Sequence, residues 1–100
     1  MQVYVVVEMF KGEKLPVVRG VYTNKIITEQ TKNDLRFAYI DEQRLIQSQS
    51  EKEIKEVFVV IELLKLNVPR IVAVFKSKEH AEEIVANTEY ETQIIEEKLI

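Results

Sequence analysis

Two glutamates are the residues of this sequence whose positions most suggest chemistry. Glu8 and Glu62 are each the only charged residue in an apolar run, and the two runs resemble one another. A close pair of carboxylates raises the pKa of one member or binds a cation, and either property supports acid–base chemistry. The alternative is a structural ion pair with Arg19 or Arg70 across a hairpin, because charges are seldom buried without a partner. We favour this alternative.

The rest of the chain offers few groups for catalysis. It has one histidine, two glycines and no cysteine, and it contains no G-x-S-x-G, no glycine-rich phosphate loop and no H-E-x-x-H. His80 follows Glu79 near the expected start of a helix, where we interpret it as a solvated surface residue rather than a member of a triad. We therefore expect a protein that is not an enzyme and that uses no metal and no cofactor.

An acidic surface in the second part of the chain is another candidate for binding. Residues 47–100 carry seven basic and eleven acidic groups, against seven and six in residues 1–46. Glu79, Glu82 and Glu83 belong to this excess, and such a surface can imitate a phosphate backbone or bind a protein. The alternative is an ordinary solvated face, because lysines lie among these glutamates.

The overall charge argues against nucleic acid as a partner. Fourteen Lys and Arg against seventeen Asp and Glu give a formal net charge of −3, which does not provide the positive surface that phosphate neutralisation requires. Aromatic residues such as Tyr4, Phe58 and Tyr90 keep a small nucleotide or nucleic-acid binder as an alternative. No apolar run approaches the roughly 20 residues that span a bilayer, and the lack of cysteine suits a reducing compartment. We expect a cytoplasmic protein with no membrane partner.

The chain contains an internal repeat. Residues 3–11 return as residues 57–65 with five identities in nine positions, and the chain endings also correspond. The repeat gives two copies, 3–46 and 57–100, joined by a polar linker, 47–56. One copy is smaller than most domains that fold alone, whereas two copies can cover each other's apolar strand faces. We therefore predict a single domain over residues 1–100.

The sequence of each copy predicts a hairpin of two strands. β-branched and aromatic residues predict opening strands at 3–10 and 57–64. Turn-forming residues at 11–16 and 66–69 lead to return strands at 17–22 and 71–75. Both residue parities of the opening strands are apolar, so we expect central strands with both faces covered.

A helix and a closing strand complete each copy. Asn24 and Ser77 are predicted N-caps, and Ala81, Ile84, Val85 and Thr88 form an apolar stripe after the second cap. The first helix is rich in β-branched residues, so we expect it to be shorter and weaker and to end at residues 33–34. Closing strands fall within 35–46 and 90–100. The predicted fold is α+β, with two pseudo-symmetric β-β-α-β copies forming one mainly antiparallel sheet and two helices packed on it.

The hairpin and helix-cap pattern resembles a known group of proteins. The opening V-Y-V-V, the run Gly20-Val21-Tyr22-Thr23 and the run Val74-Phe75-Lys76-Ser77-Lys78-Glu79-His80-Ala81 are similar to small uncharacterised proteins of phage and bacterial genomes. The resemblance implies a phage or prophage accessory protein that works by binding. It carries no catalytic residue over to this chain.

Together these observations predict a non-catalytic protein-binding module that inhibits or modulates a host or defence protein. The alternatives are a small nucleotide or nucleic-acid binder, and a carboxylate-based metal binder or enzyme that uses Glu8 and Glu62. We also expect a homodimer, because an apolar strand such as 57–64 would leave unpaired backbone groups at a sheet edge. The candidate binding residues are Glu8, Glu62, Glu79, Glu82 and Glu83.

Overall fold

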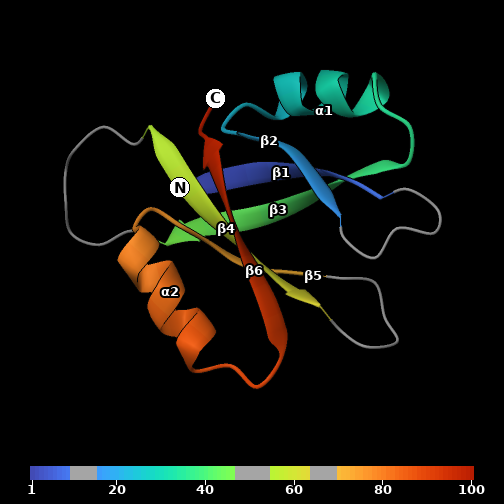
Figure 1. Ribbon diagram of the computed structural model, residues 1–100. Helices are drawn as coiled ribbons and strands as arrows, with labels where there is room; N and C mark the ends of the chain where they lie inside the picture. The colour runs from blue at the N-terminus through green and yellow to red at the C-terminus, as the bar shows by residue number, and fades with distance from the viewer. Residues whose placement is uncertain (10–15, 47–54, 64–69) are drawn as a thin grey trace.

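The computed structural model describes residues 1–9, 16–46, 55–63 and 70–100 (Figure 1). Its elements are β1 (Gln2–Glu8), β2 (Val17–Tyr22), α1 (Lys25–Asn33), β3 (Ala38–Ile46), β4 (Glu56–Leu63), β5 (Arg70–Phe75), α2 (Lys78–Ala86) and β6 (Glu91–Lys98). The predicted return and closing strands are confirmed. The predicted turns, apart from Pro16, lie outside the described residues. So does the predicted linker up to residue 54, and Glu56 belongs to β4 rather than to the linker.

The strands form one mixed six-stranded sheet in the order β2-β1-β3-β5-β4-β6. β1 pairs with β2 and β3, and β4 pairs with β5 and β6, in all four cases antiparallel. The α+β class is therefore confirmed, and β1 and β4 are central strands as predicted. The expectation that residues 57–64 form an unpaired edge is wrong over the described residues, because β4 has a neighbour on each side.

The mainly antiparallel sheet predicted from the sequence needs a correction where the two halves of the molecule meet. We call residues 1–46 the first half and residues 55–100 the second half. β3 runs parallel to β5, with Leu45 opposite Val74 and Ile46 opposite Phe75. Hairpin patterns are local and fix the β1–β2 and β4–β5 pairs, whereas nothing in the local sequence specifies which strand of the other half β3 will meet.

The two outer strands, β2 and β6, also meet, at the C-terminal end of the chain. Val21 and Leu99 form a parallel bridge. The Thr23 amide donates to the Ile100 carbonyl and the Ile100 amide donates to the Val21 carbonyl, each at 2.9 Å. The sheet is therefore joined between its halves at both β3–β5 and β2–β6, and it curls around a common interior (Figure 1).

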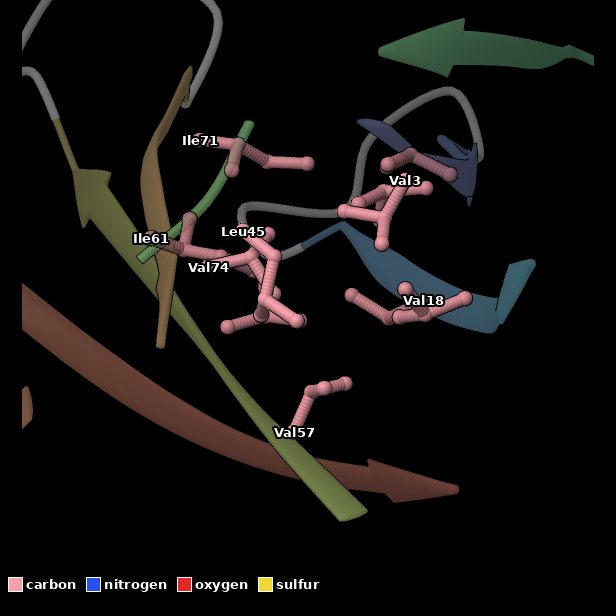
Figure 2. Packing of buried hydrophobic residues seen from close by; sticks show 11 residues of the cluster. Val3, Val18, Leu45, Val57, Ile61, Ile71 and Val74 are labelled. Atoms are coloured by element: carbon pink, nitrogen blue, oxygen red, sulfur yellow. The ribbon is translucent and has the colours of Figure 1, made fainter. Parts of the chain in front are cut away.

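One apolar cluster fills this interior, and side chains from both halves point into it (Figure 2). Its buried members are Val3, Val5, Val7, Val18, Val21, Leu45, Val57, Val59, Ile61, Ile71 and Val74. A second cluster lies on the opposite face of the second half and consists of Val60, Ala73, Phe75 and Ala81 of α2. Val57, Val59 and Ile61 of β4 thus face the common interior, and Val60 faces the helix layer. This explains why both parities of the strand are apolar.

Both helices begin at the predicted caps. The Asn24 side chain accepts from the amides of Ile26 and Ile27 at 2.8 and 3.2 Å, and the Ser77 hydroxyl accepts from the His80 amide at 3.3 Å. The prediction that the first helix is shorter is wrong, because α1 and α2 each have nine residues. Among the described residues, neither helix has the length and apolar character needed to cross a membrane.

Two threonines of α1 satisfy their hydroxyls within the helix. The Thr28 hydroxyl donates to the Asn24 carbonyl at 2.7 Å, and the Thr31 hydroxyl donates to the Ile27 carbonyl at 3.0 Å. Thr28 is fully buried, so its hydroxyl needs such an internal acceptor. Hydrogen bonds to carbonyls four residues earlier allow threonine to face the sheet without an unsatisfied polar group.

Candidate functional site

The two glutamates singled out in the sequence are buried, and each is held by an arginine. Arg19 contacts one carboxylate oxygen of Glu8 through Nη2 at 2.7 Å and through Nε at 2.8 Å. Arg70 contacts Glu62 through Nη2 at 3.4 Å. The structure thus shows the ion-pair alternative, with a separate arginine for each carboxylate. Both glutamates are buried.

The two ion pairs differ in how firmly the guanidinium is held. The Arg19 side chain is 42% exposed and places two nitrogens on Glu8, whereas the Arg70 side chain is 66% exposed and makes one long contact. Charge-assisted bonds between nitrogen and a carboxylate are usually about 2.7–2.9 Å long. The Glu8 pair has this geometry, and the Glu62 pair is looser.

A groove opens beside Glu62 on the outer face of the second half. Its volume is about 490 Å³, and it is formed by α2, the loop that follows α2, and strands β4, β5 and β6. We call it the α2 groove. It is lined by Val60, Val72, Ile84, Val85 and Tyr90, and by the polar residues Glu62, Asn87, Thr88, Glu89 and Thr92. Its volume falls in the range of roughly 300–1,000 Å³ that is typical of ligand sites.

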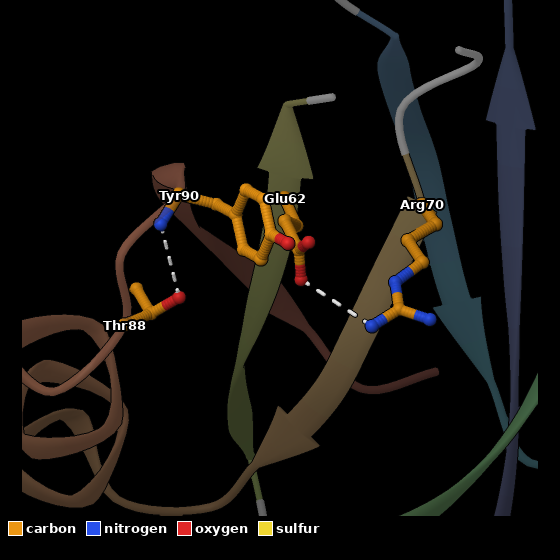
Figure 3. A network of polar contacts seen from close by, with 4 residues as sticks. All are labelled: Glu62, Arg70, Thr88 and Tyr90. Atoms are coloured by element: carbon orange, nitrogen blue, oxygen red, sulfur yellow. Dashed lines mark hydrogen bonds and ion pairs between the residues drawn. The ribbon is translucent and has the colours of Figure 1, made fainter. Parts of the chain in front are cut away.

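The wall of the α2 groove contains exposed apolar side chains. Val72, Ile84 and Tyr90 are all exposed although they are large and apolar. Figure 3 shows the Tyr90 ring projecting toward the Glu62 carboxylate, with Arg70 on the other side of that carboxylate. The Tyr90 amide donates to the Thr88 hydroxyl at 3.3 Å, which fixes the backbone from which the ring projects. An exposed apolar wall therefore surrounds a buried carboxylate.

The end of α2 determines which residues line the groove. The sequence predicted that Ala81, Ile84, Val85 and Thr88 would form one stripe facing the sheet. Ala81 is buried and Val85 packs on the second apolar cluster, but α2 ends at Ala86 with Asn87 as its C-cap. Thr88 therefore belongs to the loop, and Ile84 stays exposed at the groove.

The groove is acidic. Glu62 and Glu89 line it, and no lysine or arginine is found among the described residues that form its wall. Arg70 pairs with Glu62 but does not itself line the groove. Clefts lined by one sign of charge attract ligands of the opposite sign. The groove thus favours a ligand that is both cationic and apolar.

The three acidic candidates on α2 are exposed and do not line the groove. Hydrogen bonds from the backbone amide of Glu79 and from the Ser77 hydroxyl lower the pKa of the Glu79 carboxyl below its ordinary value. Glu82 lies 3.9 Å from Lys78, one helical turn away. The carbonyl of Glu83 accepts from the Asn87 side chain at 2.9 Å. These residues place negative charge on the helix that forms one wall of the groove.

His80 does not behave as the solvated residue expected from the sequence. It is half-buried, and its ring lies 4.8 Å from the ring of Phe75 at a tilt of 58°. This contact makes His80 part of the packing between α2 and the sheet. Within the described residues, no group of three or more histidine, cysteine or acidic side chains is placed to hold a metal ion.

Sequence reasoning did not find the α2 groove. The sequence singled out Tyr90 only as one of several aromatic residues of a possible nucleotide or nucleic-acid binder, and Ile84 as part of an apolar stripe. The available signal was the position of Tyr90 between Glu89 and Glu91, since a large aromatic residue between two charges is often exposed. No family model, no curated protein and no solved structure matches the chain.

Proposed function

We propose that the protein is a non-catalytic protein-binding module whose binding face is the α2 groove. The observation that carries this proposal is the exposure of Val72, Ile84 and Tyr90 around one groove that also contains a buried carboxylate. Exposed apolar side chains gathered within a polar surround mark interaction sites. Tyrosine is also enriched among the residues that contribute most to protein–protein binding.

The polar groups around the groove suit recognition. The Thr88 hydroxyl is fixed by the Tyr90 amide, and the Asn87 side chain is fixed by the Glu83 carbonyl. Glu62 is buried and already contacts Arg70. A preorganised surface of this kind loses little conformational entropy when a partner binds.

The proposal extends to the kind of partner. The resemblance to small phage and bacterial proteins favours a phage or prophage accessory protein that inhibits or modulates a host or defence protein. The exposed glutamates of α2, which are Glu79, Glu82 and Glu83, would steer a basic surface of that partner toward the groove.

We also propose that the two halves are pseudo-symmetric copies. The parallel pair Leu45–Val74 joins the halves at one junction, and the parallel bridge Val21–Leu99 joins them at the other. Each half also carries a buried glutamate in its first strand with an arginine from its second strand. A duplicated unit that covers its apolar face with a second copy would produce these correspondences.

The binding proposal can be tested by affinity capture with matched variants. Ile84→Ser and Tyr90→Ala change the groove, while Ile26→Ser and Phe37→Ala change exposed apolar residues of the first half. We expect a bacterial protein that is retained by the wild type and by the first-half variants and is lost with the groove variants. The purified partner should then bind the groove variants at least about tenfold more weakly, since truncation of an interface anchor commonly costs 2 kcal/mol or more. Equal binding to all variants would show that the groove is not the binding face.

A further inference from the structure

We infer that the α2 groove receives an arginine side chain of the partner protein, whose guanidinium pairs with Glu62 in place of Arg70. The inference rests on the proposed function and names the chemical group that the groove recognises. It is carried by the geometry of Glu62, by the position of Arg70 and by the side chains that surround them.

Glu62 provides the counter-ion. It is only 5% exposed and lines the groove, so a cation that reaches it is partly shielded from water, and their attraction is correspondingly strong. Arg70 contacts one oxygen of this carboxylate at 3.4 Å. Arginine and carboxylate prefer two parallel bonds of about 2.7–2.9 Å. The contact with Arg70 is therefore well short of the best that Glu62 can make with a guanidinium.

Arg70 shows that a guanidinium can reach Glu62 from the solvent side. Its side chain is 66% exposed, and it extends from the start of β5 toward the carboxylate (Figure 3). The Arg70 guanidinium is largely solvated even when it is paired, and its one contact with Glu62 is long. A competing guanidinium that makes shorter bonds can therefore replace Arg70 without leaving the buried carboxylate unpaired.

The side chains around Glu62 fit arginine better than lysine. Val72 and Ile84 offer apolar surface to an aliphatic stem, and the Tyr90 ring projects toward the carboxylate. A guanidinium stacks on aromatic rings and is more weakly hydrated than an ammonium group. It therefore loses less hydration on entering a site that is partly closed. Glu89 adds a second negative charge to the groove.

The charge requirement can be tested with short peptides on the unmodified protein. The probes are acetyl-Leu-Arg-Leu-amide and the same peptide with citrulline or lysine at the central position. Citrulline keeps the shape of arginine and removes its charge. Binding is followed by NMR through the methyl signals of Val72 and Ile84 as peptide is added to millimolar concentration. We expect the arginine peptide to bind and the lysine peptide to bind more weakly than the arginine peptide. The citrulline peptide should bind at least about tenfold more weakly than the arginine peptide.

Variants at the two ion pairs supply matched controls. Glu62→Gln should weaken binding of the arginine peptide by about tenfold or more. Glu8→Gln changes the corresponding ion pair away from the groove and should leave the affinity for this peptide unchanged. Arg70→Ala should strengthen binding several-fold because it removes the internal competitor, and Arg19→Ala should not. Weaker binding by Arg70→Ala would overturn the inference. So would equal binding of the arginine and citrulline peptides, a result that needs no variant to fold.

The inference and the proposed function can fail separately. If Ile84→Ser abolishes capture of the partner while Glu62→Gln and an excess of the arginine peptide have no effect, the groove is the binding face but arginine is not what it recognises. If Ile84→Ser leaves capture unchanged, the proposed function itself is wrong.

Discussion

The ion pairs Glu8–Arg19 and Glu62–Arg70 place the same two residue types in the first two strands of each half, yet they have different geometry. Arg19 is the third residue of β2, and Arg70 is the first residue of β5. An arginine inside a strand has its backbone fixed on both sides, and it places two nitrogens on its glutamate. An arginine at the start of a strand has less support and makes one long contact. The comparison suggests that the position of the arginine decides whether a buried carboxylate is only structural or also available to a ligand.

The largest expected effect concerns the dependence of each half on the other. The main apolar cluster takes six buried residues from the first half and five from the second, so each half alone would expose its part of that cluster. We expect residues 1–50 and residues 51–100, made as separate chains, to lack stable structure by circular dichroism, and to regain it when mixed. Cooperative unfolding of either chain alone would contradict the shared core.

The second prediction compares a small residue in the hairpin ladder of each half. Gly20 lies opposite Val6 in the β1–β2 ladder and Ala73 lies opposite Val60 in the β4–β5 ladder. A Cβ at Gly20 would come within 2.6–2.7 Å of the Tyr22 ring. Gly20→Ala should therefore lower the free energy of unfolding by about 1–3 kcal/mol in urea titrations, because the buried ring must move.

The reverse exchange in the second half is the control. Ala73→Gly should cost roughly 0.5–1 kcal/mol, chiefly through the added backbone freedom of the unfolded chain. A smaller loss for Gly20→Ala than for Ala73→Gly would show that the Tyr22 ring is not confined by its neighbours.

The third prediction tests the difference between the ion pairs through stability. Arg19→Ala removes the close partner of a buried carboxylate and should cost about 1–2 kcal/mol. Arg70→Ala removes a more exposed and more distant partner and should cost less than about 1 kcal/mol. Chemical denaturation of the two variants side by side measures the contrast. Equal losses would mean that Glu62 depends on its arginine as much as Glu8 does, and the explanation from strand position would fail.

Much of the local structure was predictable from the sequence because it depends on residues a few positions apart. The β-branched runs predicted the strands, and Asn24 and Ser77 predicted both helix starts. The Glu–Arg pairs were also foreseeable as one of two possibilities, since each joins the two strands of one hairpin. The parallel pairing of Leu45 with Val74 could not be predicted from the sequence. These residues are far apart in the chain, and an apolar residue at either position suits many neighbours.

The α2 groove was not predictable for a different reason. Its wall combines residues of α2, of the loop after it and of three strands, and only the complete fold brings these together. The apolar stripe from Ala81 to Thr88 predicted one face toward the sheet, whereas α2 ends at Ala86 and Ile84 is exposed. The exact end of a helix is also below the accuracy of pattern reading.

The fourth prediction concerns the difference between the two helix caps. Asn24 accepts two amide bonds, at 2.8 and 3.2 Å, whereas Ser77 accepts one at 3.3 Å. Asn24→Ala should cost about 1 kcal/mol and Ser77→Ala should cost about half of that. Thermal unfolding of the two variants gives the comparison. A larger loss at Ser77 would indicate that α1, despite its better cap, contributes less to the stability of the whole.

The smallest expected effect on stability comes from a difference between the β1–β3 strand pair and the β4–β6 strand pair. In the first half Gln2 lies opposite Arg44, and in the second half Glu56 lies opposite Lys98 at the corresponding place. The second half therefore has a carboxyl where the first has an amide. A hydrogen bond with Glu56, together with its negative charge, raises the pKa of Glu96 above the ordinary glutamate value.

The fifth prediction is that Glu56→Gln makes the second half behave like the first. In the wild type the folded chain keeps a proton on Glu96 at pH values where the unfolded chain has released it. The free energy of unfolding therefore falls as the pH rises from the ordinary glutamate pKa through the raised value. Glu56→Gln removes the neighbouring charge, so the pKa of Glu96 measured by carboxyl NMR should fall and the pH dependence should become shallower. Some dependence of the same sign should remain, because burial raises the pKa of Glu97 independently. An unchanged pKa of Glu96 in the variant would show that Glu56 does not cause the shift.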